Sequence, residues 1–268
     1  MSPKRIFRIA YHSSQRSDPR FRIHQLRDGD AFAQLSMVLY SRGYDEYGGL
    51  LLNLPSESKV EAPPVDGSFL TSSDLVVLNT RPPINDKSAH NRHRVRCSYT
   101  ELEDKIFAAL RPGYLKKCAR SEIILPEVIA KQLHGDFRNK AFIQFHSSQD
   151  SSYMRYRGYD DEFWSKPPVD EKRTAVYLIQ LPAIWPGGPG LLAAFGMAGA
   201  ETLVWNYLLR TRFRKWIDSY QFLIAEVLLR NLPDRPIDLS FADDWEVTPM
   251  LRIPFSQNIS ESADNPRN

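Results

Sequence analysis

A glycine-rich turn between an apolar run and a helical pattern is the strongest chemical signal in the sequence. It spans residues 195–202, with the sequence FGMAGAET. Glycines at a strand-to-helix turn let a ligand approach the backbone, and the first N–H groups of the helix attract an anion such as phosphate. We predict that Gly196, Gly199 and Thr202 bind a phosphorylated ligand. Glu201 is then placed to contact a ribose hydroxyl or to act as a general base.

The same turn has a purely structural interpretation, in which the glycines permit close helix packing and Glu201 complements the helix dipole. It lacks the third glycine of the dinucleotide fingerprint and the lysine of a P-loop. Two glycines, a threonine and a glutamate at a helix start resemble the nucleotide N-glycosidases of the lysine-decarboxylase-like fold. Here Glu201 precedes Thr202, and the likeness is confined to this turn. The resemblance implies hydrolysis of a nucleotide glycosidic bond.

Polar residues also follow three other apolar runs. The sequence HSSQ occurs at residues 12–15 and again at 146–149, and NTR occurs at 79–81. Ligands of α/β proteins bind in loops at the carboxyl ends of parallel strands, and an arginine can pair with a phosphate through two hydrogen bonds. The predicted ligand-binding residues in these loops are His12, Ser13, Asn79 and Arg81. Coincidence explains the repeat better than a duplication, because no similarity extends beyond these four residues. Asn79 has an alternative role in reversing the chain before Pro82.

A second acidic candidate is Glu226, which interrupts the apolar run 222–229. A carboxylate in a buried strand must be solvated, paired or protonated, so Glu226 is a candidate general acid or base. Alternatively it points outward from an edge strand or pairs with an arginine. With Glu201 or Glu226 activating water, the chain would hydrolyse a glycosidic or phosphate bond of a nucleotide.

Two further segments suggest a protein-interaction module without a small ligand. Residues 87–96 hold six basic or histidine side chains and no acid, and residues 153–164 mix aromatic side chains with arginines and acids. His90, His93, Cys97 and Cys118 match no standard zinc spacing, so we predict no metal site. The sequence does not identify a cofactor.

The elements that would position these residues alternate between strands and helices. We expect an α/β, Rossmann-like fold with a mostly parallel sheet flanked by helices, and leave open an antiparallel hairpin at one edge from residues 142–191. A polar loop is expected at 146–172. The expected strands are 6–11, 50–52, 75–78, 142–145, 175–181, 191–195 and 222–229, and the expected helices are 31–43, 99–110 and 202–212.

Composition fits one packed domain, which we place at residues 1–255, followed by a disordered tail at 256–268. A net charge of +3 argues against a nucleic-acid partner. The longest apolar stretch of helical length, 203–209, is too short for a membrane span, and no signal peptide is seen. Two cysteines suit a reducing compartment. We therefore expect a soluble cytoplasmic protein with a small nucleotide-like anionic ligand and no membrane partner, and leave a homo-oligomer open.

Overall fold

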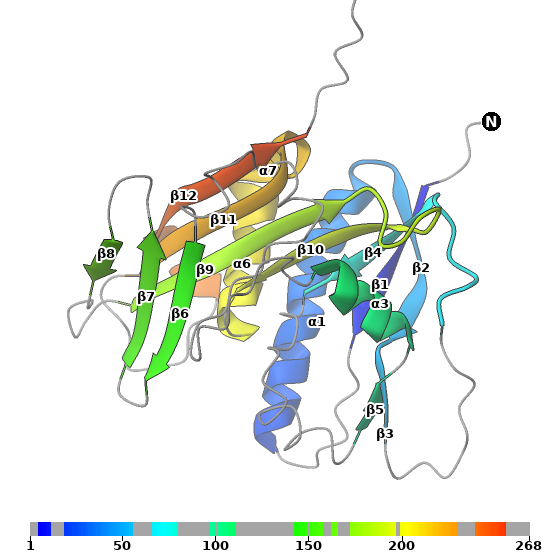
Figure 1. Ribbon diagram of the computed structural model, residues 1–268, viewed down its shortest axis with the longest axis horizontal. Helices are drawn as coiled ribbons and strands as arrows, with labels where there is room; N and C mark the ends of the chain where they lie inside the picture. Colours follow the sequence, from blue (N-terminus) through cyan, green and yellow to red (C-terminus); the bar gives the residue numbers. More distant parts are fainter. Residues whose placement is uncertain are drawn as a thin grey trace, which may run out of the picture.

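A computed structural model describes most of the chain (Figure 1). The described residues are 5–11, 19–55, 66–79, 97–99, 101–110, 142–148, 151–157, 162–165, 172–196, 199–229 and 239–255. The predicted tail at 256–268 lies outside these ranges. None of the helices in the described ranges is both long enough and apolar enough to cross a membrane.

The centre of the fold is a mixed seven-stranded sheet. In spatial order its strands are β12 (Trp245–Pro254), β11 (Tyr220–Leu229), β9 (Lys172–Leu181), β10 (Gly190–Gly196), β4 (Asp74–Leu78), β1 (Arg5–Tyr11) and β2 (Tyr44–Leu51). The β2–β1, β1–β4 and β4–β10 pairings are parallel, and the β10–β9, β9–β11 and β11–β12 pairings are antiparallel. The fold is therefore α/β, as predicted, but half of its sheet is antiparallel.

Apolar runs explain why the inner parallel strands form. Every residue of β10 after Gly190 is buried, and four of the five residues of β4 are buried. A strand covered on both faces needs such a continuous run rather than an alternating pattern. The predicted hairpin is also present, because β9 and β10 are joined by the tight turn 182–189. It lies inside the sheet rather than at its edge, because β11 pairs with the other side of β9.

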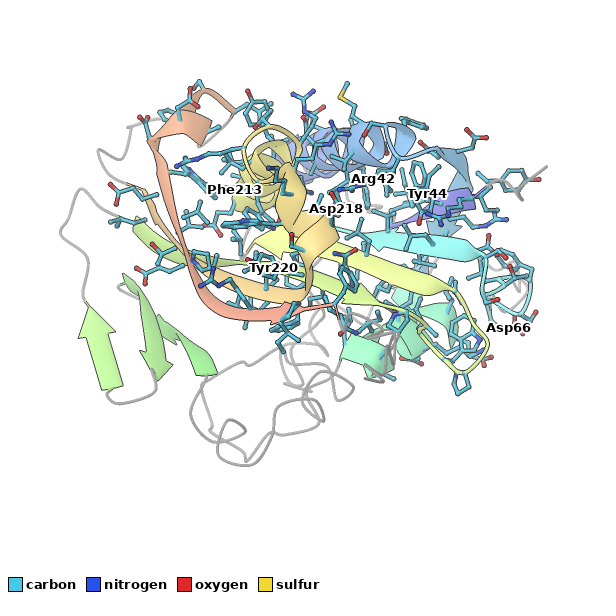
Figure 2. All side chains as sticks on the ribbon, turned by 90° about the horizontal axis from the view of Figure 1, so that it is seen from above. Arg42, Tyr44, Asp66, Phe213, Asp218 and Tyr220 are labelled. Atoms are coloured by element: carbon cyan, nitrogen blue, oxygen red, sulfur yellow. The ribbon has the colours of Figure 1, made fainter. Side chains whose placement is uncertain are left out.

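Helices cover both faces of this sheet, and Figure 2 shows the two layers. The helices α1 (Pro19–Tyr40) and α6 (Gly199–Thr211) lie on one face together with the short α7 (Arg214–Ser219). The helix α3 (Glu101–Leu110) packs on the opposite face. Alternation along the strands separates the two cores, since Val77 belongs to the first and Val76 and Leu78 to the second.

The helix α1 confirms one prediction and corrects another. Its buried residues repeat with helical spacing, and it ends three residues before Gly43, whose φ of 78° suits glycine at a helix end. It starts at Pro19, twelve residues before the expected start at residue 31. Proline is favoured at the first helical position, because its fixed φ fits the helix and its missing N–H would be unpaired there.

Two smaller sheets complete the described fold. One pairs β3 (Asn53–Pro55) with β5 (Cys97–Tyr99), and the other is an antiparallel meander of β6 (Phe142–Ser148), β7 (Ser151–Arg157) and β8 (Glu162–Ser165). The expected loop at 146–172 was therefore wrong, because much of it forms strands. In the sequence, Met154 and Tyr156 alternate with Arg155 and Arg157, which is the period-two pattern of a strand.

The strand β12 and the helix α7 were not predicted. β12 contains Pro249 and ends at Pro254, which argued against a strand, since proline cannot donate a ladder hydrogen bond. The structure explains its tolerance, because β12 lies at the edge of the sheet and pairs only with β11 among the described strands. The short helix η1 (Leu239–Asp244) leads into it.

Candidate functional site

The adjacent strands β1 and β4 direct the chain to opposite faces of the sheet. β1 continues through α1 to its parallel neighbour β2, and α1 packs on one face. β4 leads to its parallel neighbour β10 through a long stretch that includes α3, which packs on the other face. In open α/β sheets, ligands bind in the crevice outside the carboxyl ends of the strands where this reversal occurs. The end of β1 and β4 is thus the place to look for a site.

Two buried asparagines meet at this edge. Asn79 follows β4 directly, and Asn206 lies on α6. The Nδ2 of Asn206 donates hydrogen bonds to the Oδ1 of Asn79 at 3.1 Å and, more weakly, to the carbonyl of Ala31 on α1 at 3.4 Å. Asn206 is 0% exposed and therefore joins β4, α1 and α6 in the interior.

The amide of Asn206 also has an acceptor without a partner. Its Oδ1 is buried and accepts no hydrogen bond among the described residues. A buried acceptor of this kind destabilises a protein by about 1–3 kcal/mol when left unpaired. Most such groups bind an ordered water, an ion or a ligand. The Oδ1 of Asn206 is therefore an unsatisfied acceptor at the carboxyl edge of the sheet.

The glycine turn lies next to this pair and is tightly packed. The N–H of Gly196 donates to the Oγ1 of Thr202 at 2.9 Å. A Cβ at position 196 would lie 2.7 Å from the Cβ of Glu201 and 3.0 Å from its carbonyl carbon. Gly196 thus allows α6 to begin directly against the end of β10. These contacts favour the structural interpretation of Gly196 and Thr202, and their ligand-binding roles stay predictions.

The two candidate glutamates lie on opposite sides of the sheet. Glu201 is buried in the first turn of α6 and packs on Gly196. Glu226 follows Ala225, whose side chain packs toward α1 and α6, so the side chain of Glu226 leaves from the opposite face. The strand β9 also separates β11 from β10. Glu201 and Glu226 are therefore not a paired acid and base.

Glu226 lies in an interior strand, between Ala175 of β9 and Thr248 of β12. The alternative that Glu226 points outward from an edge strand is therefore wrong, because β11 pairs with a strand on each side. Burial raises the pKa of the Glu226 carboxyl above its ordinary value of 4.5, because the charged form loses water contacts. Such a group holds its proton to higher pH than an exposed glutamate does.

Several predicted residues lie outside the described ranges: His12, Ser13, Arg81, the basic segment 87–96 and Cys118. Gly199 is the first residue of α6 and is half-buried. Within the described part of the chain, no group of three or more His, Cys, Asp or Glu side chains is arranged to hold a metal ion.

Asn206 was not predicted as a site residue, because it lies within the apolar stretch 203–209 of a helix. The signal was present, since Asn206 follows Thr202 by four positions, and such residues share one face of a helix. After the first turn of α6, which also buries Glu201, the buried residues of the helix other than Asn206 are apolar. An amide within such a face needs a polar partner, and that partner is at the end of β4.

Comparison with known proteins found no matching family model and no significantly similar curated protein or solved structure. Function must therefore be inferred from the residues themselves.

Proposed function

We propose that this chain binds a nucleotide or a related phosphorylated small molecule in a crevice at the carboxyl ends of β1, β4 and β10. The arrangement would be Rossmann-like, with the ligand at the point where the chain reverses direction between β1 and β4. The observation that carries the proposal is the buried hydrogen bond between Asn206 and Asn79 at that point, with the Oδ1 of Asn206 left without a partner.

An unpaired amide oxygen suits a ligand that donates a hydrogen bond. The ribose hydroxyls and the exocyclic amines of a nucleotide are donors of this type. Because the Oδ1 of Asn206 is buried, contact with a ligand requires either a small displacement of the covering atoms or one bridging water. A ligand that donates a hydrogen bond to this oxygen would remove the destabilisation caused by the unpaired acceptor. Binding should therefore stabilise the fold.

The start of α6 supplies the second support. α6 is 13 residues long and begins at Gly199, just after the end of β10. Its first N–H groups have no partners within the helix and favour an anion such as a phosphate. By sequence, His12 and Ser13 directly follow β1, and Arg81 comes two positions after Asn79. We propose these residues as the remaining ligand contacts.

A hydrolase is the second candidate, and the buried Glu226 favours an acid–base role. Glu226 leaves the opposite face of the sheet from α6, so it would not act in the same crevice as Glu201. Hydrolysis in the proposed crevice would therefore use Glu201 to activate water. Turnover during the binding experiment separates this enzyme from a protein that only senses its ligand.

The test is a thermal-shift screen of the purified chain against nucleoside mono-, di- and triphosphates, NAD, cyclic dinucleotides and sugar phosphates. A ligand at about 100 times its dissociation constant adds about 2.7 kcal/mol, which raises the melting temperature by several degrees. We expect Asn206→Leu to abolish the shift.

Trp205→Phe is the matched control. It removes the hydrogen bond from Trp205 Nε1 to the carbonyl of Tyr177, and it lies on the same turn of α6. It should lower stability but keep the ligand-induced shift. The proposal is wrong if no ligand in the screen gives a shift, or if Asn206→Leu and Trp205→Phe respond equally to the ligand.

A further inference from the structure

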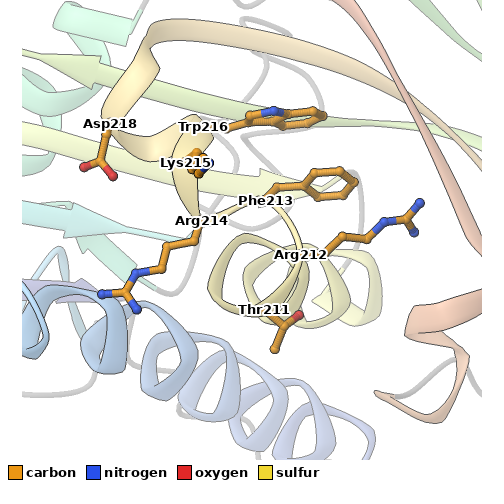
Figure 3. A pocket seen from close by; sticks show the side chains of 7 residues that line it. All are labelled: Thr211, Arg212, Phe213, Arg214, Lys215, Trp216 and Asp218. Atoms are coloured by element: carbon orange, nitrogen blue, oxygen red, sulfur yellow. The ribbon is translucent and has the colours of Figure 1, made fainter.

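A pocket of about 550 Å³ lies at the corner between α6 and α7, and Figure 3 shows its walls. The residues that line it, called here the cation pocket, are Thr211, Arg212, Phe213, Arg214, Lys215, Trp216 and Asp218. We propose that the cation pocket binds a di- or triphosphate chain. This site is separate from the crevice proposed above, because it lies at the carboxyl end of α6 and the crevice lies at its amino end.

The pocket carries an excess of positive charge. Arg212, Arg214 and Lys215 form no ion pair within the described part of the chain. The acid in the wall, Asp218, is already paired, because its Oδ1 lies 2.8 Å from an Nη2 of Arg42 (Figure 2). Three cations around one pocket are therefore left to attract an anion from solution.

Arg212 is held in place by an aromatic stack. Its guanidinium carbon lies 5.1 Å from the centre of the Phe213 ring, and its Nη1 donates to the carbonyl of Trp245 at 3.1 Å. The Phe213 ring also stacks on Trp216, with the ring centres 4.1 Å apart. A fixed guanidinium loses less conformational entropy when it binds an anion than a free one does.

Arg214 is held on the other side of the pocket. Its Nη2 donates to the Oγ of Ser41, and its carbonyl accepts from Arg42. Figure 3 shows Arg212 and Arg214 extending in different directions from the corner, with Lys215 beside Arg214. Guanidinium groups bind phosphate oxygens through planar pairs of N–H donors. Cations on two sides fit an extended chain of phosphates better than a single phosphate.

A structural role for these cations is the alternative. Basic side chains near the end of a helix stabilise it by offsetting its negative dipole end. However, the hydrogen bonds of Arg212 and Arg214 go to Trp245 and Ser41 rather than to the last carbonyls of α6. The dipole therefore does not account for how these two side chains are oriented.

The first experiment is isothermal titration calorimetry with sodium tripolyphosphate at constant ionic strength. The variant Arg214→Gln/Lys215→Gln removes two charges from the cation pocket. Arg5→Gln/Arg252→Gln removes two exposed charges elsewhere, from β1 and β12. A hydrogen bond between charged groups is worth about 1.5–3 kcal/mol, so the pocket variant should bind at least about tenfold more weakly. The control should change affinity by less than about twofold.

The single variant Lys215→Gln is a second test in case the double variant misfolds. It should fold normally, because no described contact of the Lys215 side chain would be lost. It should still weaken tripolyphosphate binding measurably. The proposal is overturned if wild type does not bind tripolyphosphate, if orthophosphate binds as tightly, or if the two double variants lose affinity equally, which would indicate a general charge effect.

ATP and AMP distinguish the source of the phosphate chain. If ATP binds and the pocket variant loses that binding while AMP does not bind, the ligand is a nucleoside triphosphate held by its phosphates. If tripolyphosphate binds and ATP does not, the source is inorganic. ATP binding that survives in the pocket variant but is lost in Asn206→Leu belongs to the crevice, and would then support the proposed function rather than this one.

Discussion

The side chain of Asn206 on α6 donates a hydrogen bond to the side chain of Asn79 at the end of β4, across 127 positions of sequence. Both residues are almost fully buried. The bond links the helix that follows β10 to the end of a neighbouring strand in the same sheet. This one contact joins α6 to the carboxyl edge of the sheet.

Removing Asn206 alone should therefore destabilise the protein. Asn206→Leu leaves the Oδ1 of Asn79 and the carbonyl of Ala31 without this donor, and we expect a loss of about 1–3 kcal/mol in the free energy of unfolding. The double variant Asn79→Leu/Asn206→Leu removes both partners, so it should lose less than the sum of the two single changes. Urea unfolding of the four proteins measures the coupling. Strict additivity would show that the two side chains do not act together.

Gly196 should not tolerate a side chain. In Gly196→Ala, the new Cβ would lie 2.7 Å from the Cβ of Glu201 and 3.0 Å from backbone atoms. Overpacking of this kind lowers stability by about 1–3 kcal/mol. Gly29→Ala is the control, because nothing lies within 4 Å of a Cβ there and the position is helical. It should stabilise the helix by up to about 1 kcal/mol. Calorimetric melting of both variants tests the contrast, and equal effects would refute the close packing of α6 on β10.

Much of the central sheet follows from sequence patterns that are local. The apolar runs of β4, β10 and β11 are unbroken or nearly so, and they predict buried strands without any knowledge of their neighbours. The helical spacing of α1 and the turn before α6 are equally local signals. Strand order is different, because it depends on which distant segments pair, and the sequence carries no direct record of that.

The difference between local patterns and long-range pairing also explains which residues of the candidate site could be predicted from the sequence. Gly196 and Glu201 were found because they stand together in one turn. Asn206 was not found, because its partner Asn79 lies on another strand and the pairing exists only in the folded protein. The cation pocket was missed for a related reason. Ser41 and Arg42 come from the turn after α1 and Trp245 comes from β12, and these residues hold its side chains.

Glu226 should make stability depend on pH in a particular direction. Burial raises its pKa in the folded state above the ordinary 4.5, so the native protein prefers the protonated carboxyl. The contribution of Glu226 to the free energy of unfolding is fully present below the pKa of the unfolded state. It is lost as pH rises through the pKa of the folded state. Glu226→Gln cannot ionise, so its stability relative to wild type should rise from pH 4 to pH 7.

Urea unfolding at several pH values measures this difference. Glu246→Gln, at an exposed position of β12, is the control for a general change in net charge. It should not change the pH dependence by a comparable amount. A stability difference between wild type and Glu226→Gln that stays constant over this pH range would show that burial does not raise the pKa of Glu226.

The variant Asp218→Asn should change tripolyphosphate binding more than it changes the free energy of unfolding. The Asp218 side chain is 64% exposed, and an ion pair as exposed as the one with Arg42 contributes about 0–1 kcal/mol to stability. Asp218→Asn removes the negative charge from the pocket wall and leaves Arg42 without this counter-charge, so tripolyphosphate binding should tighten by about two- to tenfold. Asp104→Asn, on α3 at the opposite face of the sheet, makes the same change in net charge. Titration calorimetry should show no comparable gain for it. If both variants bind equally tightly, net charge rather than the pocket governs the affinity.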